Sequence, residues 1–237
     1  MPTRFIPYVK ALVHILCLVP LLYLVERYRA GALALEADPV NVITHFTGNW
    51  ALWILLISLA VTPLRRLHPK LSNVIRFRRL VGLYAFFYAA LHLATYVFLF
   101  SGYDLQAALG GLKAGHPGEV VHQWKLAWPG MLDDLTKRRF IQVGLLSWVI
   151  LLALAVTSPQ WTLRKMGGKN WQRLHSLVYL AAAAACVHYW WLVKAGVRTP
   201  GPVTVALLVL LLARVVWKVM KRRKKPAARV VAALAGQ

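Results

Sequence analysis

Long apolar runs alternate with short, mostly basic segments along the chain. A helix needs roughly 20 mostly apolar residues to cross a bilayer, and six runs come close to that length. They cover residues 9–26, 46–62, 80–100, 140–157, 174–193 and 202–219. The pattern predicts an all-α, polytopic membrane protein folded as a six-helix transmembrane bundle.

Several breaks between the runs coincide with proline, which ends or kinks helices. We expect helix ends at Thr62-Pro63 and Ser158-Pro159, and a helix start at Pro200-Gly201-Pro202. No convincing internal repeat is visible. One domain is expected over residues 1–220, followed by a basic cytoplasmic tail over residues 221–237.

The first apolar run shares one feature with a secretory signal peptide, because Arg4 and Lys10 precede it. No small-x-small cleavage site follows, however, and Glu26-Arg27 closes the run. We therefore expect it to be a retained first helix.

Composition supports a membrane location. Hydrophobic residues make up 59% of the chain, against roughly 45–50% in soluble domains. The net charge of +22 could suggest nucleic acid, but such a binder would not also carry several long uncharged stretches. We assign the basic residues to loops and expect no nucleic-acid partner. Cys17 and Cys186 each lie in an apolar run, and no C-x-x-C-H motif is present, so any haem would be held non-covalently.

The distribution of charge predicts the orientation in the membrane. With a cytoplasmic N-terminus, the inner segments hold 19 basic residues and the outer segments 9, while all seven acidic residues lie outside. Both termini are therefore expected in the cytoplasm. The long outer connection, residues 101–139, contains HQWKLAWPGMLDDLTKRR. It is either a segment lying on the lipid headgroups or a docking surface for an extracytoplasmic partner.

Three histidines lie within the third and fifth apolar runs, where a polar side chain costs free energy unless it has a partner. His92 is in the third run, and His175 and His188 are both in the fifth. On one helix His175 and His188 would lie roughly 20 Å apart, too far to bind one metal. His92 and His188 differ in depth by only about 3 Å. They therefore suit an axial pair for a haem iron, with nearby glycine and alanine leaving room for a flat macrocycle.

His175 lies near the cytoplasmic boundary, and no other spanning histidine matches its depth. It could ligate a second haem, approach a quinone or flavin, or bond a loop carbonyl, and His68 is one candidate partner. Each spanning histidine could also be a plain interhelical hydrogen bond, worth about 0.6–2 kcal/mol. The remaining histidines are expected at the surface or interface, and these are His14, His45, His116 and His122.

Four stretches carry a resemblance to a known family. They are GNWALWILLISLAVTPLRR at 48–66, RFRRLVGLYAFFYAALHLATYV at 76–97, KRRFIQVGLLSWVILLALAVTS at 137–158 and NWQRLHSLVYLAAAAACVHYWWLVK at 170–194. Together they resemble the haem-binding membrane subunit of the bacterial periplasmic protein-methionine-sulfoxide reductase system. That subunit belongs to the ferric-reductase-like transmembrane group.

The resemblance implies a multi-pass electron-transfer subunit of the bacterial inner membrane rather than a catalytic subunit. It would pass electrons through one or two b-type haems to a periplasmic molybdopterin-containing subunit that repairs oxidised methionines. The implied donor is quinol or a cytosolic flavin reductase, and FMN is an implied further cofactor. The family's iron-ligating histidines match His92, His175 and His188. Larger relatives carry two histidines on each of two helices, whereas this chain has only His92 on the third.

Two other functions stay open from the residues alone. A stand-alone transmembrane reductase of ferric or other metal ions would use the same haem without a protein partner. A proton channel or transporter would use the three histidines as a relay. Membrane lipid is a partner in every case.

Overall fold

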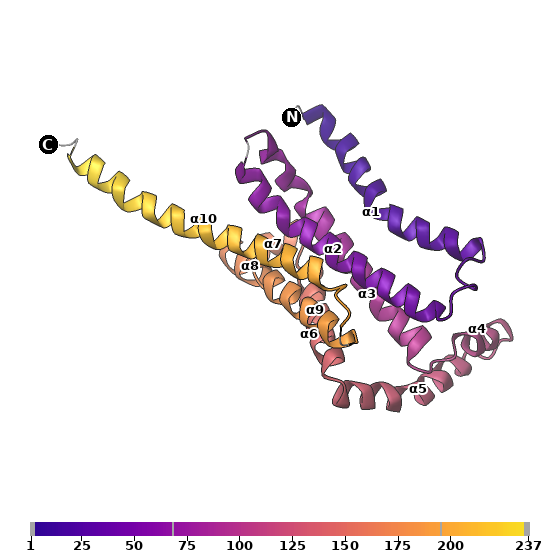
Figure 1. Cartoon of the computed structure of the whole chain (residues 1–237). Helices are drawn as coiled ribbons and strands as arrows, with labels where there is room; N and C mark the ends of the chain where they lie inside the picture. Colours follow the sequence, from indigo (N-terminus) through magenta and orange to yellow (C-terminus); the bar gives the residue numbers. More distant parts are fainter. Residues whose placement is uncertain (1–2, 68, 195, 235–237) are drawn as a thin grey trace.

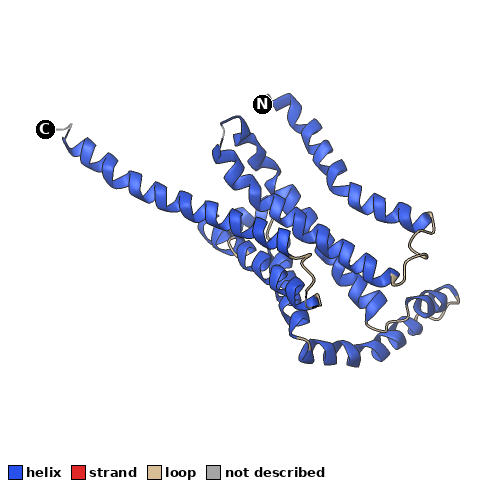
Figure 2. Ribbon diagram, viewed as in Figure 1, coloured by secondary structure: helices blue, strands red, loops and turns tan. Residues whose placement is uncertain are grey.

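The computed structural model describes residues 3–67, 69–194 and 196–234, and every regular element in these ranges is helical (Figure 2). Five helices are long and apolar enough to cross a membrane. They contain α1 (Ile6–Arg29), α2 (Pro39–Leu67), α3 (Arg78–Thr95), α6 (Arg139–Val156) and α10 (Gly201–Leu234). The third span extends beyond α3, from Asn73 to Phe100, and the last ends at Met220. The predicted all-α membrane architecture is confirmed, and five of the six predicted runs coincide with these helices.

The shorter elements connect and cover the long helices. They are η1 (Thr3–Phe5), η2 (Pro69–Phe77), η3 (Tyr96–Phe100), α4 (Leu105–Lys113), α5 (Gly118–Lys137), α7 (Gln160–Met166), α8 (Gly168–His175) and α9 (Val178–Leu192). α10 continues as a helix beyond residue 219 to Leu234 and leaves the bundle there (Figure 1). The division into a domain and a tail at residue 220 stays a prediction.

The fifth predicted run is broken. α8 ends at His175 and α9 begins at Val178, so the expectation of one continuous helix over 174–193 is wrong. Ser176 lies at the break, where its hydroxyl donates to the Arg173 carbonyl at 2.6 Å and competes with the backbone ladder. α9 has 15 residues, about 22 Å of helix, which is less than the roughly 30 Å of a hydrocarbon core. A count of six spanning helices is therefore not confirmed.

Two helix pairs form the centre of the bundle. α2 packs mainly on α3, and α6 mainly on α9, as Figure 1 shows. Small side chains bring the helices close, since Ala85 and Ala181 are completely buried in the core. The Ser147 hydroxyl donates to the Ala181 carbonyl at 2.8 Å, which ties α6 to α9. The alanine run in α9 therefore serves close helix packing.

The segment 101–139 is helical and covers one end of the bundle. α5 lies across the end where α3 finishes and α6 begins, and α4 lies beyond it (Figure 1). We call this the α5 end. The long connection 101–139 thus consists mainly of two helices, and its role as a headgroup-lying segment or a docking surface stays a prediction.

Pro63 does not end α2, although the sequence predicted a break there. Proline has no N–H, so the carbonyl one turn earlier, that of Leu59, loses its helical donor. The Arg214 guanidinium from α10 supplies a replacement, donating to the Leu59 carbonyl at 2.7 Å. Arg214 also donates to the Tyr179 hydroxyl and lies over its ring. A charged residue inside a spanning helix is thereby partnered, as an apolar environment requires.

Pro20 disturbs α1 in a related way. The Tyr88 hydroxyl from α3 donates to the Cys17 carbonyl at 2.8 Å and accepts the Leu21 N–H at 3.0 Å. These two backbone groups would bond each other in an undisturbed helix. Tyr88 is almost completely buried. Its single hydroxyl hydrogen-bonds both backbone groups at the kink and so holds α1 against α3.

Arg214→Met should lower stability by about 1–3 kcal/mol, the cost of an unpaired buried carbonyl. In a Pro63→Ala background the restored N–H satisfies the Leu59 carbonyl, so the same substitution should cost less. Thermal unfolding of detergent-purified protein measures both costs. A Pro20→Ala background is the matched control, in which the cost of Arg214→Met should not change. An equal cost in all three backgrounds would contradict the proposed link between Arg214 and Pro63.

Candidate functional site

His92 of α3 and His188 of α9 face each other inside the bundle. Their ring centroids lie 6.0 Å apart with the ring planes at 79°. The depth comparison made from the sequence predicted that these two side chains would be level. The structure confirms that they meet.

Each of these histidines is held by a backbone carbonyl of a neighbouring helix. Nδ1 of His92 lies 2.9 Å from the Thr44 carbonyl of α2, and Nδ1 of His188 lies 2.7 Å from the Phe140 carbonyl of α6. A carbonyl can only accept, so each Nδ1 carries the proton and donates. In that tautomer Nε2 keeps its lone pair and is available to a metal.

Glycines let the imidazole rings approach α2 and α6. A Cβ atom on Gly48 would lie 3.0 Å from the His92 ring, and one on Gly144 would lie 2.6 Å from Nδ1 of His188. Each glycine follows the accepting carbonyl by four residues, one helical turn. Side chains at these positions would push both histidines out of place.

The same local arrangement occurs in both helix pairs. In each pair 48 residues separate the histidine from its carbonyl partner, and the glycine stands at the same place between them. A completely buried alanine, Ala85 or Ala181, precedes each histidine by seven residues. The two helix pairs therefore share one spacing of carbonyl, glycine, alanine and histidine. The prediction of no internal repeat is wrong for this local pattern.

A cavity of about 500 Å³ lies between the two helix pairs and is lined by both histidines. This size falls within the roughly 300–1,000 Å³ typical of cofactor sites. Its inner part is apolar, with Leu52, Leu55, Ala89, Leu151 and Ala185. Polar side chains lie toward the α5 end, among them Asn41, His45, Tyr96 and Arg138. The site is thus apolar at depth and polar at its mouth.

The spacing of the two imidazoles fits one metal atom between them. A metal lies about 2 Å from a ligating imidazole nitrogen, and the ring centre roughly 1 Å behind it, so an axial pair has centroids about 6 Å apart. Among the described residues no group of three or more His, Cys, Asp or Glu side chains could hold a bare ion. A flat macrocycle that supplies the other iron ligands suits the pair and the cavity.

His175 takes no part in this pair. Its Nε2 lies 3.2 Å from the Thr157 hydroxyl, and its ring stacks on Trp171 with centroids 3.7 Å apart. His68, the candidate partner named from the sequence, lies outside the described residues. Among the residues that the structure describes, Thr157 and Trp171 make the hydrogen-bonding and stacking contacts of His175.

Two of the histidines expected at the interface have interior contacts instead. His45 lines the cavity, with its ring centroid 6.4 Å from that of Tyr189. His14 bonds the Tyr84 hydroxyl at 2.8 Å. His116 and His122 are exposed, as predicted. The shared spacing of glycine and histidine was the sequence signal that could have identified the cavity walls.

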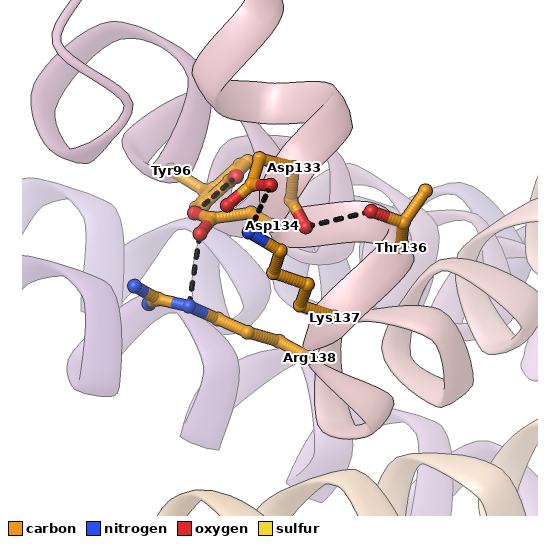
Figure 3. A network of polar contacts seen from close by, with 6 residues as sticks. All are labelled: Tyr96, Asp133, Asp134, Thr136, Lys137 and Arg138. Atoms are coloured by element: carbon orange, nitrogen blue, oxygen red, sulfur yellow. Dashed lines mark hydrogen bonds and ion pairs between the residues drawn. The ribbon is translucent and has the colours of Figure 1, made fainter.

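A polar network closes the cavity mouth, where sequence reasoning placed only loop charges. The Tyr96 hydroxyl donates to the Asp134 carboxylate at 2.9 Å, and Nε of Arg138 donates to the same carboxylate at 2.8 Å (Figure 3). Tyr96 and Arg138 both line the cavity. α5 contributes apolar lining residues as well, namely Trp124, Trp128, Met131, Leu132 and Leu135.

Comparison with known proteins places these residues in a described family. Residues 47–186 match the ferric reductase like transmembrane component, a range that includes Gly48, Gly144 and His92 but ends just before His188. No solved structure gives a significant match to the chain.

Curated relatives cover most of the chain. The protein-methionine-sulfoxide reductase heme-binding subunit MsrQ of Xanthomonas euvesicatoria pv. vesicatoria is 41% identical over 224 residues, 93% of this chain and 91% of that protein. The protein of the same name from Pectobacterium carotovorum subsp. carotovorum is 42% identical over 203 residues, 86% of this chain and 88% of that protein.

Gly144→Ala should destabilise the protein by about 1–3 kcal/mol, because the added methyl overlaps the His188 ring. Gly48→Ala should cost less, since its contact is longer. Gly82→Ala on α3 is the matched control, because its methyl would lie 3.4 Å from the Ser58 hydroxyl. Helix propensity should there stabilise by up to about 1 kcal/mol. Thermal unfolding measures all three, and equal shifts would show that the glycines do not make room for histidine.

Proposed function

The chain belongs to the ferric-reductase-like transmembrane family and, within it, to the protein-methionine-sulfoxide reductase haem-binding subunits, and we propose that it carries electrons through a b-type haem. The observation that supports this most is the His92–His188 pair, with centroids 6.0 Å apart at the cavity. A bound haem would supply one-electron redox chemistry.

The protein's own residues position and enclose that group. His92 and His188 would present Nε2 to the iron, while the carbonyls of Thr44 and Phe140 hold the tautomer and the ring orientation. The apolar inner wall excludes water, which influences the potential of a redox centre. No other chemistry is required of these side chains.

The two ends of the bundle suit different partners. Quinol or a cytosolic flavin reductase would deliver electrons at the end with His175 and the basic residues of 63–79. A periplasmic molybdopterin-containing catalytic subunit would accept them at the α5 end. This arrangement rests on an inner-membrane location with both termini in the cytoplasm. His175 would be a ligand of a second haem only with a partner from outside its present contacts, and FMN rests on the family resemblance alone.

Replacing His92 or His188 with alanine should reduce the haem content at least about tenfold, since even weaker perturbations of metal sites cost 10–100-fold. The measurement is the pyridine haemochrome content and visible spectrum of haem-supplied, purified protein. The control is His122→Ala, which removes an exposed histidine of α5.

His175→Ala tests a second haem separately, because His175 does not line the cavity. A wild-type protein without a Soret band would refute electron transfer and favour the proton relay. Unchanged spectra in both His92→Ala and His188→Ala would refute the assigned pair.

Purified protein reduced with dithionite should transfer electrons faster to a periplasmic molybdopterin methionine sulfoxide reductase than to chelated ferric iron. Stopped-flow oxidation of the haem band measures both rates under the same conditions. The reverse order would favour a stand-alone metal reductase.

A further inference from the structure

The cavity mouth carries a single strong cation. Among the described residues that line the cavity, Arg138 is the only arginine or lysine, and none is an aspartate or glutamate. The inner wall is apolar, as shown above. A ligand that fills this cavity would therefore find its only fixed positive charge at the α5 end.

Arg138 is also fixed in place relative to His188. It caps the N-terminus of α6, two residues before Phe140, whose carbonyl holds Nδ1 of His188. On its other side Asp134 accepts from Nε of Arg138 and from the Tyr96 hydroxyl. The guanidinium is therefore tied through Asp134 to α5 and, through the Tyr96 hydroxyl, to η3.

The ion pair with Asp134 leaves most of the guanidinium free. It uses Nε, and Figure 3 shows the two terminal nitrogens pointing away from the aspartate. Arginine has five N–H donors, and a guanidinium edge matches a carboxylate through two parallel hydrogen bonds. The Arg138 side chain is 50% exposed, so these nitrogens are accessible to a ligand.

We propose that Arg138 binds the propionate carboxylates of the haem and orients the macrocycle with its propionate edge toward the α5 end. This assignment rests on the proposed function. A b-type haem has one apolar edge and one edge with two carboxylates, which matches a cavity that is apolar at depth and cationic at its mouth. The propionate edge then faces the end assigned to the electron acceptor.

The test combines a substitution with a modified haem, in the manner of a double-mutant cycle. Wild-type full chain and Arg138→Gln are each loaded with haem b or with its dimethyl ester, which carries no carboxylate charge. Transfer of the pigment to apomyoglobin gives its rate of loss, and redox titration gives the midpoint potential.

Arg138→Gln should lose haem b roughly 10–100-fold faster, the factor expected for a lost charge-assisted hydrogen bond. Its midpoint potential should fall, because removing a nearby positive charge favours the ferric state. The two proteins should lose the dimethyl ester at the same rate. Arg138→Lys keeps the charge without the paired hydrogen bonds, so its loss rate should be intermediate.

Arg139→Gln is the matched control, because Arg139 is adjacent and exposed but does not line the cavity. It should retain haem b like the wild type. Equal loss of haem b from wild type and Arg138→Gln would overturn the assignment, as would an equal acceleration for both pigments. Failure of the wild type to bind haem b at all would overturn the proposed function and this assignment with it.

Discussion

The central hydrogen bonds of the structure run from two imidazoles to two backbone carbonyls. His92 donates to Thr44 and His188 to Phe140, and each bond satisfies a polar group in apolar surroundings. The bonds need close approach, which Gly48 and Gly144 allow. Because the same bonds leave both Nε2 atoms available, one constraint determines the helix packing and the chemistry of the cavity together.

Backbone groups left without a helical partner by proline are likewise satisfied by hydrogen bonds from other helices. At Pro63 the carbonyl left without a donor is bonded by Arg214, and at Pro20 the Tyr88 hydroxyl bridges the disturbed turn. In both cases a side chain from another helix replaces a helical hydrogen bond, as apolar surroundings demand. Pro20 and Pro63 therefore mark points of helix contact, whereas Pro159 and Pro200 stand beside a helix end and a helix start, as the sequence predicted.

Residues at the α5 end both cover the cavity and connect neighbouring helical elements. α5 covers the mouth of the cavity with aromatic and apolar side chains, while Tyr96, Asp134 and Arg138 join three elements there. An electron carrier needs a redox group shielded from water yet close to a partner surface. The single helix α5 over a cavity with an apolar inner wall meets both requirements.

Hydrophobic run length determined the all-α membrane fold, because about 20 apolar residues have no other stable arrangement than a spanning helix. Depth along two helices was enough to pair His92 with His188, since helical rise is uniform. The break after His175, the passage of α2 through Pro63 and the helical cover formed by α5 were decided by tertiary structure. Each depends on a hydrogen bond or a packing contact that local pattern does not contain: a serine hydroxyl, a distant arginine, and a cavity that only the assembled helix pairs enclose.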